Sequence, residues 1–573
     1  MVDGRHLPTR PLLAGGILVL ALLLAFVPSL ASDFAPLDDG KNFLGNPHYR
    51  GLAPANLRWM LTTNHMGHYI PLTWITLGLD YLVWGLKPFG YHLTSLMFHL
   101  ANAVLFLLLA RRLLLLRQPG LPASAALGGA LAAALFFAVH PLRVESVVWI
   151  SERRDVVCGF FSLLALNAYL SAVAQGRPRR LLGCALLFAC ALLSKGIALA
   201  LPVVLLALDA TVLRRLPPRP RLWLRAEHRP VLLEKIPFLA MALASALVTT
   251  LSIRYVMSPL STLGLDARLA ALAKSLTFYV QKTLFPWPLP PLVPRTARVS
   301  LATPEFAVSA LVLLATVAIL IAGRRRFPGI AAAAIVYAAF VLPVSGLAQA
   351  GPQLVAHRYS YLSCWPWAFL LGAGVAQLLA RPGRRGRALT LALSAVVASG
   401  LVVATRAQAR IWRDPYSFAS AAATGAPEAA QPRYTLAGIH LRAGRFEEAA
   451  RQIRIGLLHN PAAQGLMNLA GLLFATCPDP RVRSPREALL QANRLARETE
   501  FRDPWALFTL SAALAENGEY PAAQDAAHRA RAIAERQGIP DLVRRLGVAL
   551  PLYESGQPLR MAPADWGEGA SPE

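Results

Sequence analysis

Long apolar runs recur along this chain, and most are long enough to cross the hydrocarbon core of a membrane. A helix needs about 20 apolar residues to span that core, which is roughly 30 Å thick. Of the 573 residues, 55% are hydrophobic and only 15% are charged, whereas soluble domains carry about 25% charged residues. Because lipid cannot satisfy the polar groups of an irregular backbone, the runs must be helical. The chain is therefore predicted to be an all-α, polytopic membrane protein.

Eleven runs are predicted to cross the membrane, and groups of Arg at alternate ends predict which ends face the cytoplasm. This asymmetry places the N-terminus, with Arg5 and Arg10, in the cytoplasm, and the C-terminal region on the opposite side. The runs are Leu12–Leu30, Leu93–Ala110, Ala123–Val139, Val156–Val173, Leu181–Leu193, Ile197–Leu213, Ile236–Ile253, Val308–Ala322, Ile330–Val344, Ser363–Leu379 and Leu389–Ala404.

Two segments leave alternatives open. Residues 1–31 are either a retained first crossing or a cleaved signal peptide, since "SLAS" (29–32) offers small residues at a cut site. The many later crossings favour retention. Residues 268–286 are apolar but contain Lys274 and Lys282, so they form either a helix at the lipid interface or a tilted crossing.

The formal net charge of +26 does not indicate a nucleic-acid-binding protein. The Arg residues lie in short groups between apolar runs, as topology requires, and they form no basic face. The five cysteines include no Cys-x-x-Cys pair, so neither a zinc site nor a disulfide framework is predicted.

The last third of the chain changes to Ala, Arg and Glu with helical periodicity. Residues 434–461 fit a tetratricopeptide unit with Gly444 at its turn, and residues 507–532 repeat the scheme with Gly518, around an irregular unit that begins near residue 469. Stacked units form a groove that suits an extended protein segment. The predicted divisions are a membrane domain (1–405), a linker (406–430), a repeat domain (431–545) and a flexible tail (546–573).

Ionisable residues gather in the outward loops, at the level of the membrane surface. A solvated loop explains any one of them, but charge next to lipid is costly and usually lines a cavity. Intramembrane charges of transporters typically lie in the middle of helices, so this placement favours chemistry at the outer surface. The residues are Asp33, Asp38, Asp39, His65, His68, His140, Arg143, Glu145, Glu152, Arg153, Arg154, Asp155, Lys195, His357 and Arg358.

An ordered set of motifs resembles the membrane part of the transmembrane and tetratricopeptide-repeat O-mannosyltransferases, and resembles their bacterial relatives more closely. The resemblance extends over nearly the whole chain. The motifs are "DD…KN…NP" (38–47), "GHYIPLTW" (67–74), "GYHLTSLMFHLANA" (90–103), "HPLRVESVVWISERRDVV" (140–157), "LLSK" (192–195) and "HRYSYL" (357–362).

This resemblance implies the C-type glycosyltransferase fold, a polyprenyl- or dolichyl-phosphate-linked sugar as donor, and reaction on the extracytoplasmic face. In that fold a carboxylate of the first outer loop acts at the reaction centre, and the matching positions are Asp38 and Asp39. One departure concerns Lys195, which is followed by Gly196 where animal members usually have an acidic residue. That leaves a charge pair at this turn in doubt.

The resulting hypothesis assigns roles to the outward residues. Asp38 or Asp39 is the base toward an acceptor hydroxyl, with the choice between them open, and turn capping is the structural alternative. Glu145 is the next catalytic candidate. The donor phosphate is assigned to Arg154, Lys195 and Arg358, for which contact with lipid headgroups is the alternative. Further substrate-binding candidates are His68, His140, Arg143, Asp155, His357 and Tyr361.

The predicted function is transfer of a sugar, with mannose one candidate, to an extracytoplasmic acceptor such as a protein Ser or Thr hydroxyl. The repeats would bind the acceptor or a partner protein. The predicted location is a bacterial inner membrane. No cofactor is predicted, and metal dependence stays open because His65, His68 and His140 are more simply explained as structural histidines. The alternatives are a non-catalytic membrane-anchored scaffold and a lipid-linked-sugar transporter.

Overall fold

The computed structural model describes residues 9–177, 179–217, 219–253, 264–294, 298–347 and 353–566. Arg5 and residues 567–573 of the predicted tail therefore lie outside the described residues. The chain divides into two compact units, Met1–Asp414 and Pro415–Glu573. Within the described ranges the regular structure is helical, apart from one isolated β-bridge between Pro294 and Gln353.

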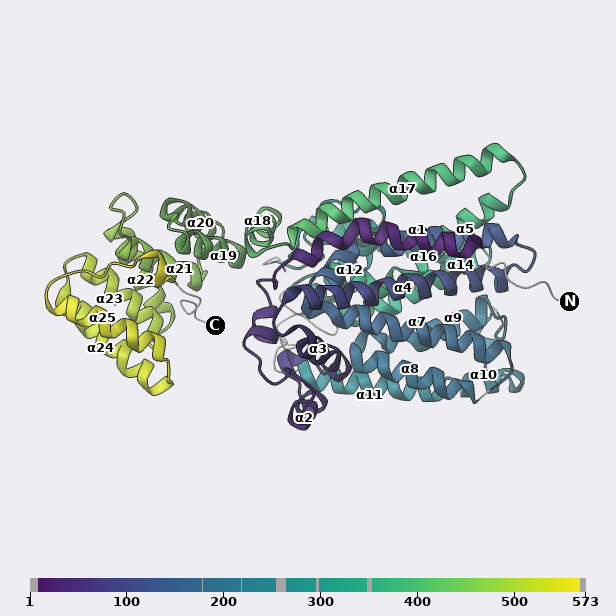
Figure 1. Ribbon diagram of the computed structural model, residues 1–573, viewed down its shortest axis with the longest axis horizontal. Coiled ribbons are helices and arrows are strands. Elements are labelled where there is room, and N and C mark those ends of the chain that lie inside the picture. The colour runs from purple at the N-terminus through teal and green to yellow at the C-terminus, as the bar shows by residue number, and fades with distance from the viewer. Residues whose placement is uncertain are drawn as a thin grey trace. The chain divides into compact units, whose positions relative to one another are not determined.

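The first unit is a bundle whose long helices lie roughly side by side (Figure 1). Several helices begin at a proline, which has a helical φ and lacks the N–H that the first turn leaves unpaired. The helices are α1 (Thr9–Phe26), α2 (Pro54–Thr62), α3 (Pro71–Trp84), α4 (Pro88–Arg117), α5 (Ala123–Ala138), α6 (Val144–Val148), α7 (Arg153–Ala174), α8 (Arg180–Ser194), α9 (Leu201–Thr211), α10 (Arg229–Leu233), α11 (Ile236–Ile253), α12 (Leu265–Leu284), α13 (Pro304–Gly323), α14 (Pro328–Val341), α15 (Ser360–Ser363), α16 (Trp365–Ala380) and α17 (Arg384–Ile411).

Five helices of the described ranges are long and apolar enough to cross a membrane, and the number rises to eight if each of three bent helix pairs is one span. Shorter apolar helices cover Arg180–Ser194, Gly196–Thr211 and Pro328–Val344. Each of the eleven predicted runs coincides with helical structure, while eleven crossings stay a prediction. Helix α12, which covers most of the segment 268–286 whose position was left open, is not among these described spans.

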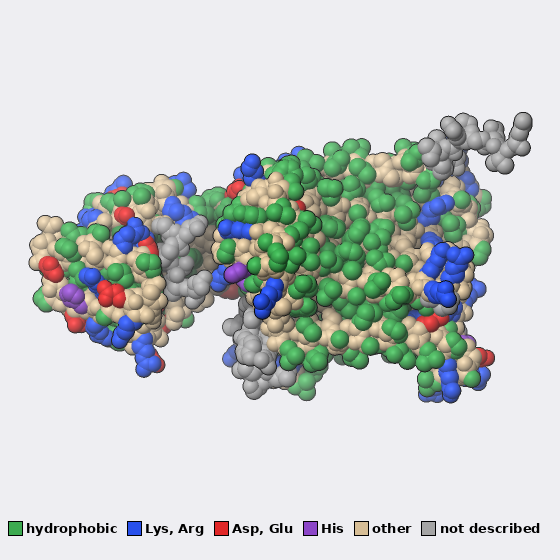
Figure 2. All heavy atoms as spheres, turned by 60° about the horizontal axis from the view of Figure 1, so that its bottom comes forward, with side chains coloured by type: hydrophobic (Ala, Val, Ile, Leu, Met, Phe, Trp, Pro, Cys, Tyr) green, Lys and Arg blue, Asp and Glu red, His purple; other side chains and the backbone are tan. Residues whose placement is uncertain are grey.

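The surface of the first unit agrees with a membrane environment. Hydrophobic side chains cover a broad part of the face shown in Figure 2, and charged side chains gather toward its ends. In an apolar stretch of 18 residues in each of α13 and α17, only 11% of the residues are buried inside the protein. Water would make so much exposed apolar surface costly, whereas lipid does not. These are the features of a membrane protein.

Helices α5 and α16 pack closely because small residues face each other. A Cβ atom on Gly129 would lie 2.5 Å from the Gly372 carbonyl oxygen and 2.6 Å from Ala376 Cβ. Without a hydrophobic drive between helices in lipid, such close backbone approach is a main source of association. The contact therefore brings together two distant parts of the chain. Helix α5 comes before the charged segment 140–155, and α16 comes after η11 (His357–Tyr359), the turn that carries Arg358.

The second unit consists of successive helix pairs. Gly444 (φ +69°) and Gly518 (φ +82°) follow the first helices of two pairs, in a left-handed conformation that favours glycine. This confirms both predicted turn positions, whereas assignment of the pairs as tetratricopeptide repeats stays a prediction. The helices are α18 (Pro415–Gly425), α19 (Ala430–Arg442), α20 (Phe446–His459), α21 (Gln464–Thr476), α22 (Pro485–Glu498), α23 (Pro504–Glu516), α24 (Tyr520–Gln537) and α25 (Pro540–Glu554).

The end of the described chain differs from the flexible tail predicted for 546–573. Residues up to Glu554 belong to α25. Beyond it, Leu559, Met561 and Trp566 are buried in the same hydrophobic core as α21 and α23. Three large apolar side chains in a short segment supply enough buried surface to hold it in place. The other predicted domain boundaries stay predictions.

Candidate functional site

The loop between α1 and α2 is fastened by Asp39 to the turn just before α7. Its Oδ2 accepts a hydrogen bond from the Ala35 amide (2.8 Å), and its Oδ1 accepts from the Ser151 amide (3.1 Å) and hydroxyl (2.5 Å). The side chain is fully buried. Burial raises the pKa of Asp39 to about 7, although the three hydrogen bonds act in the opposite direction. Because all its contacts are internal, Asp39 acts as a clamp on the loop.

Asp38 has a different environment from its neighbour. Its side chain is half-buried and lines a small cavity of about 20 Å³ together with His65, His68 and Arg154. Its carboxylate makes no hydrogen bond or ion pair to any described residue. Burial raises the pKa of Asp38, against the opposing effect of Arg154 and Arg358. Of the two adjacent carboxylates, Asp38 is the one that an incoming molecule can reach.

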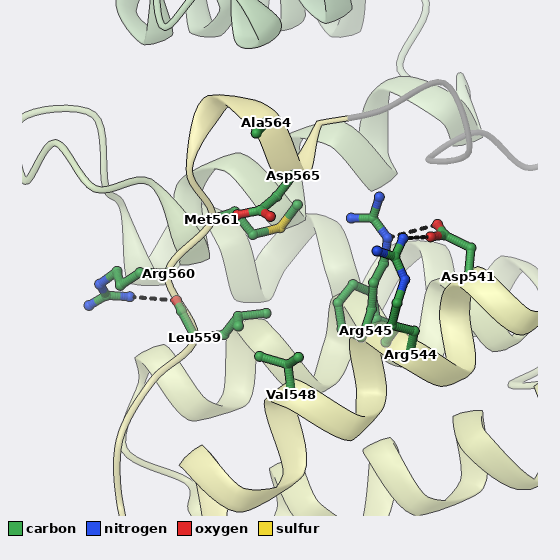
Figure 3. A pocket seen from close by; sticks show the side chains of 10 residues that line it. Asp541, Arg544, Arg545, Val548, Leu559, Arg560, Met561, Ala564 and Asp565 are labelled. Atoms are coloured by element: carbon green, nitrogen blue, oxygen red, sulfur yellow. Dashed lines mark hydrogen bonds and ion pairs between the residues drawn. The ribbon is translucent and has the colours of Figure 1, made fainter.

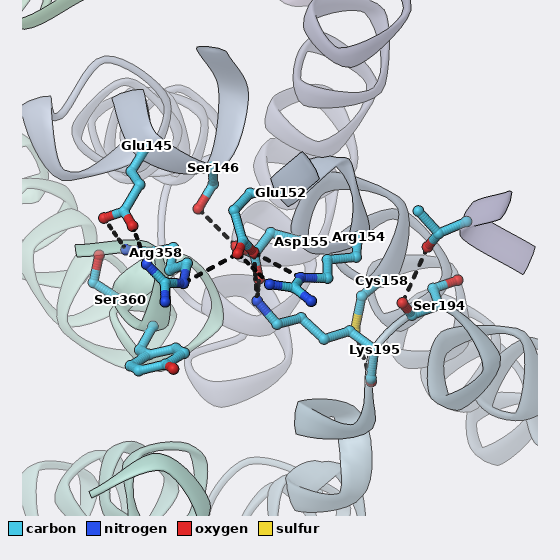
Figure 4. A network of polar contacts seen from close by, with 12 residues as sticks. Glu145, Ser146, Glu152, Arg154, Asp155, Cys158, Ser194, Lys195, Arg358 and Ser360 are labelled. Atoms are coloured by element: carbon cyan, nitrogen blue, oxygen red, sulfur yellow. Dashed lines mark hydrogen bonds and ion pairs between the residues drawn. The ribbon is translucent and has the colours of Figure 1, made fainter. Parts of the chain in front are cut away.

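A cluster of six charged side chains lies next to this cavity, and Glu152 is at its centre (Figure 4). The Glu152 carboxylate accepts two hydrogen bonds from Arg154, one of them at 2.9 Å through Nε. It also lies 2.9 Å from Lys195 Nζ and 3.1 Å from Arg358 Nε. Three cations from three separate segments thus converge on one buried carboxylate.

Two more carboxylates complete the cluster. Asp155 accepts from Lys195 Nζ at 2.8 Å and from the Ser146 hydroxyl at 3.0 Å. Glu145 pairs with the Arg358 guanidinium and accepts from the Arg358 amide at 3.1 Å. The three cations therefore balance three carboxylates, which is what allows six buried charges to coexist.

Lys195 has charge partners at the turn where the sequence left such a pair in doubt. They come from α7 and the turn before it, not from the next residue. A Cβ on Gly196 would lie 2.9 Å from Thr249 Oγ1, so a larger side chain at 196 requires the Thr249 side chain to move.

Three of the predicted substrate-binding residues serve internal packing. His140 has both ring nitrogens engaged, with the Leu142 amide (3.2 Å) and the Thr283 carbonyl (3.1 Å). Arg143 donates to the Ser360 carbonyl (2.6 Å) and hydroxyl (2.8 Å).

The Tyr361 hydroxyl lies 2.8 Å from both His99 Nδ1 and Asn102 Nδ2. All three predicted residues are buried among these partners, so their polar atoms are directed inward; they are His140, Arg143 and Tyr361.

The two remaining histidines lie nearer to the charge cluster. His357 stacks on Phe278 with ring centroids 5.9 Å apart, and its Nδ1 is 3.9 Å from Glu145. His68 lines the same cavity as Asp38. The positive charge of Arg154 is the main cause that lowers the pKa of His68, and burial is the second.

Within the described ranges, no group of three or more His, Cys, Asp or Glu side chains is placed to hold a metal ion.

Three important residues were not predicted as site residues. Glu152 begins the "ERRD" stretch, and Ser151 comes directly before it. Their roles depend on contacts with distant segments of the chain, which the fold brings together. Asp80 forms an ion pair with the buried Arg153, and this pairing directs Arg153 away from the charge cluster. A signal existed for Glu152, because it lies among the charged residues of the loop that the sequence predicts to face outward.

Sequence comparison finds similar curated proteins that are named Protein O-mannosyl-transferase. The chain is 36% identical over 125 residues to Protein O-mannosyl-transferase Tmtc3 of Drosophila melanogaster, covering 20% of this chain and 13% of that protein. It is 37% identical over 101 residues to TMTC3 of Mus musculus (18% and 10%). It is 29% identical over 174 residues to TMTC1 of Homo sapiens (28% and 18%).

These matches cover much less of the chain than the near-complete resemblance expected from the motifs. The chain spans less than a fifth of the length of each of these three relatives in the alignments. No family model and no solved structure matches the chain. Over the aligned part, the chain is a relative of the TMTC O-mannosyl-transferases.

Proposed function

We propose that this protein is a membrane glycosyltransferase that moves a sugar from a polyprenyl-phosphate-linked donor to a hydroxyl group on the extracytoplasmic side. The observation that carries the proposal is an unpaired carboxylate, Asp38, in a cavity beside the charge cluster, which contains three cations. Sugar transfer from a lipid phosphate needs both a proton acceptor and cations for the leaving group. The similarity to proteins named O-mannosyl-transferases supports this class of reaction.

In the proposed reaction Asp38 takes the proton from the acceptor hydroxyl. The acceptor oxygen forms a bond to the anomeric carbon as the bond from that carbon to the phosphate oxygen breaks. The electron pair of the broken bond stays on the phosphate, which leaves with one more negative charge. A single displacement of this kind inverts the anomeric configuration.

The two arginines of the cluster retain donors for that phosphate. No hydrogen bond to a described residue engages Nη1 of Arg154 or Nη2 of Arg358, whereas their other groups are held by Glu152 and Glu145. Guanidinium groups fixed in this way cost little to orient when the phosphate charge develops. Lys195, already shared by Glu152 and Asp155, contributes at longer range.

Asp39, Glu152 and Asp155 are positioning residues in this scheme. Asp39 holds the loop that carries Asp38, while the two acidic residues of the cluster hold the cations. Glu145 positions Arg358 and is the second candidate base.

For the substrates we propose mannose as the sugar and a protein Ser or Thr hydroxyl as the acceptor, because the similar proteins carry the name Protein O-mannosyl-transferase. We place the protein in a bacterial inner membrane with its N-terminus in the cytoplasm. The second unit would then bind the acceptor or a partner protein on the outer side.

Mass spectrometry of extracytoplasmic glycoproteins and glycolipids tests the proposal. Three strains are compared, which carry the wild-type chain, no chain, and the Asp38→Asn variant. We expect hexose-modified peptides in the wild type and their loss in both other strains. Identical glycans with and without the chain contradict the enzyme proposal, and glycans retained by Asp38→Asn contradict the role of Asp38 alone.

A further inference from the structure

The guanidinium group of Arg358 is held by aromatic rings as well as by carboxylates. Its Cζ atom lies 5.4 Å from the centroid of the Trp149 ring and 5.0 Å from that of the Tyr359 ring. At these distances a cation is attracted to the face of a ring. Glu145 and Glu152 pair with its nitrogen atoms. The carboxylates therefore attract the charge, and the rings leave the flat group little room to tilt.

Packing fixes the side chain of Trp149. The residue lies between α6 and η5 (Ile150–Glu152) in an extended conformation, and it is 4% exposed. Its buried indole N–H makes no hydrogen bond to any residue that the structure describes. Because buried polar groups usually have such a partner, the orientation of this ring depends on the ring that packs against it.

That ring belongs to Trp412, which follows the last residue of α17. The centroids of the Trp149 and Trp412 rings are 5.8 Å apart, and their planes are inclined by 28°, so the two rings are stacked. Trp412 is 4% exposed. A continuous line of contacts thus runs from Trp412 through Trp149 to Arg358.

The backbone around Trp412 is fixed on both sides. Thr405 on α17 donates its hydroxyl to the Val139 carbonyl at 2.7 Å. The carbonyl of Arg413, the next residue after Trp412, accepts a hydrogen bond from the Asp33 amide at 2.9 Å. These bonds join the end of α17 to two other segments of the first unit, so the Trp412 ring is a rigid support for the ring packed on it.

Two arginines of the second unit have the opposite environment. Arg544 and Arg545 both pair with Asp541 beside an open pocket (Figure 3). The Arg544 side chain is 76% exposed, whereas that of Arg358 is 11% exposed. An exposed ion pair is screened by water and restrains its side chains weakly. Arg544 therefore serves as a reference for a weakly held arginine in the same chain.

We propose that Trp412 is a positioning residue for the donor-phosphate site, because its ring supports Trp149, which keeps the Arg358 guanidinium in place for the departing phosphate. A guanidinium already in position costs no reorganisation when charge develops on that phosphate. Trp412 itself needs no contact with either substrate. The inference rests on the proposed function for the role of Arg358, whereas the packing behind it can be measured without sugar transfer.

The first measurement is the rate at which phenylglyoxal modifies Arg358, followed by peptide mass spectrometry of the full chain in detergent and normalised to Arg544. Trp412→Leu removes the supporting ring, and we expect Arg358 to be modified about 10-fold faster than in the wild type. Trp412→Phe keeps a ring and should stay within about 3-fold of the wild type. Trp84→Leu removes a ring from another partly buried pair, with Phe89, and should leave the rate unchanged.

The second measurement is steady-state sugar transfer from polyprenyl-phosphate mannose by the same variants. The support acts on the phosphate as it departs, so its loss weakens an interaction that is strongest in the transition state. Trp412→Leu should therefore lower kcat about 10-fold and change KM for the donor by less than about 3-fold. Trp412→Phe should restore most of kcat.

Unchanged modification of Arg358 in folded Trp412→Leu overturns the inference, as does equal modification in Trp412→Leu and Trp412→Phe. Faster modification with an unchanged kcat also overturns it, because Arg358 then moves without effect on the reaction. A wild type that transfers no sugar contradicts the proposed function, while the modification rates still decide whether Trp412 holds Arg358. If Trp412→Leu does not fold, Trp412→Met replaces it with the same expected results, since the flexible Met side chain fills irregular space better.

Discussion

The pH dependence of stability offers a sharp test of the Asp39 clamp. Burial raises the pKa of Asp39 from 3.8 to about 7. A carboxyl group with a raised pKa in the folded state binds its proton more tightly there than in the unfolded chain. Its contribution to stability is therefore fully present below pH 3.8 and is lost as the pH rises through about 7.

The magnitude follows from this shift. Each pH unit between the two pKa values changes the free energy of unfolding by about 1.4 kcal/mol. Allowing for half-titration near pH 7, the wild type loses about 2 kcal/mol between pH 5 and pH 7 through this group. Asn at position 39 does not titrate. The Asn side chain cannot accept all three hydrogen bonds, so the variant carries a penalty that does not change with pH. The free energy of unfolding of the variant minus that of the wild type should nevertheless rise by about 2 kcal/mol from pH 5 to pH 7.

The assay is unfolding of the purified protein in detergent at pH 5, 6, 7 and 8, with Asp39→Asn beside the wild type. Asp33→Asn removes the same charge from an exposed position of the same loop and serves as the control. The free energy of unfolding of Asp39→Asn minus that of the wild type should rise with pH, and it should rise by more than the same difference for Asp33→Asn. A difference for Asp39→Asn that is constant, or that falls with pH, refutes the reasoning.

Three further outcomes follow from the contacts. Gly129→Ala should destabilise the first unit by about 1–3 kcal/mol through overpacking against Gly372, whereas Gly374→Ala, with nothing within 4 Å, should be neutral; equal midpoints in detergent would contradict the close α5–α16 contact. Gly456→Ala meets Leu466 and Arg433 and should lower the unfolding midpoint of the second unit, which Gly438→Ala should not. Arg358→Lys keeps the charge but cannot pair with both Glu145 and Glu152, so it should lower kcat of sugar transfer; an unchanged rate in the folded variant would remove Arg358 from the site.

Features set by local pattern were predictable from the sequence. Apolar runs imply helices wherever they occur, and all eleven coincide with helical structure. Gly444 and Gly518 mark turns because their left-handed backbone favours glycine. The segments that carry the charge cluster were recognisable as charged stretches between apolar runs, since polar groups avoid the lipid.

Roles set by distant partners were not predictable. Arg153 and Arg154 are adjacent in sequence, but a helix turns them about 100° apart, so one faces Asp80 and the other faces Glu152. Asp38 and Asp39 differ in the same way, because only Asp39 meets Ser151, 112 residues away. His140 and Arg143 carry the chemistry of binding residues, yet their partners in the fold use it internally.

The rate of sugar transfer by the Asp38→Asn variant tests the central claim most directly. The protein is reconstituted in liposomes that contain radiolabelled polyprenyl-phosphate mannose, and a Ser/Thr peptide is the acceptor. Loss of the base should lower the rate by about 100-fold or more, while Asp33→Asn retains the wild-type rate. An Asp38→Asn enzyme as active as the wild type would contradict the assignment of Asp38 as the base at this site.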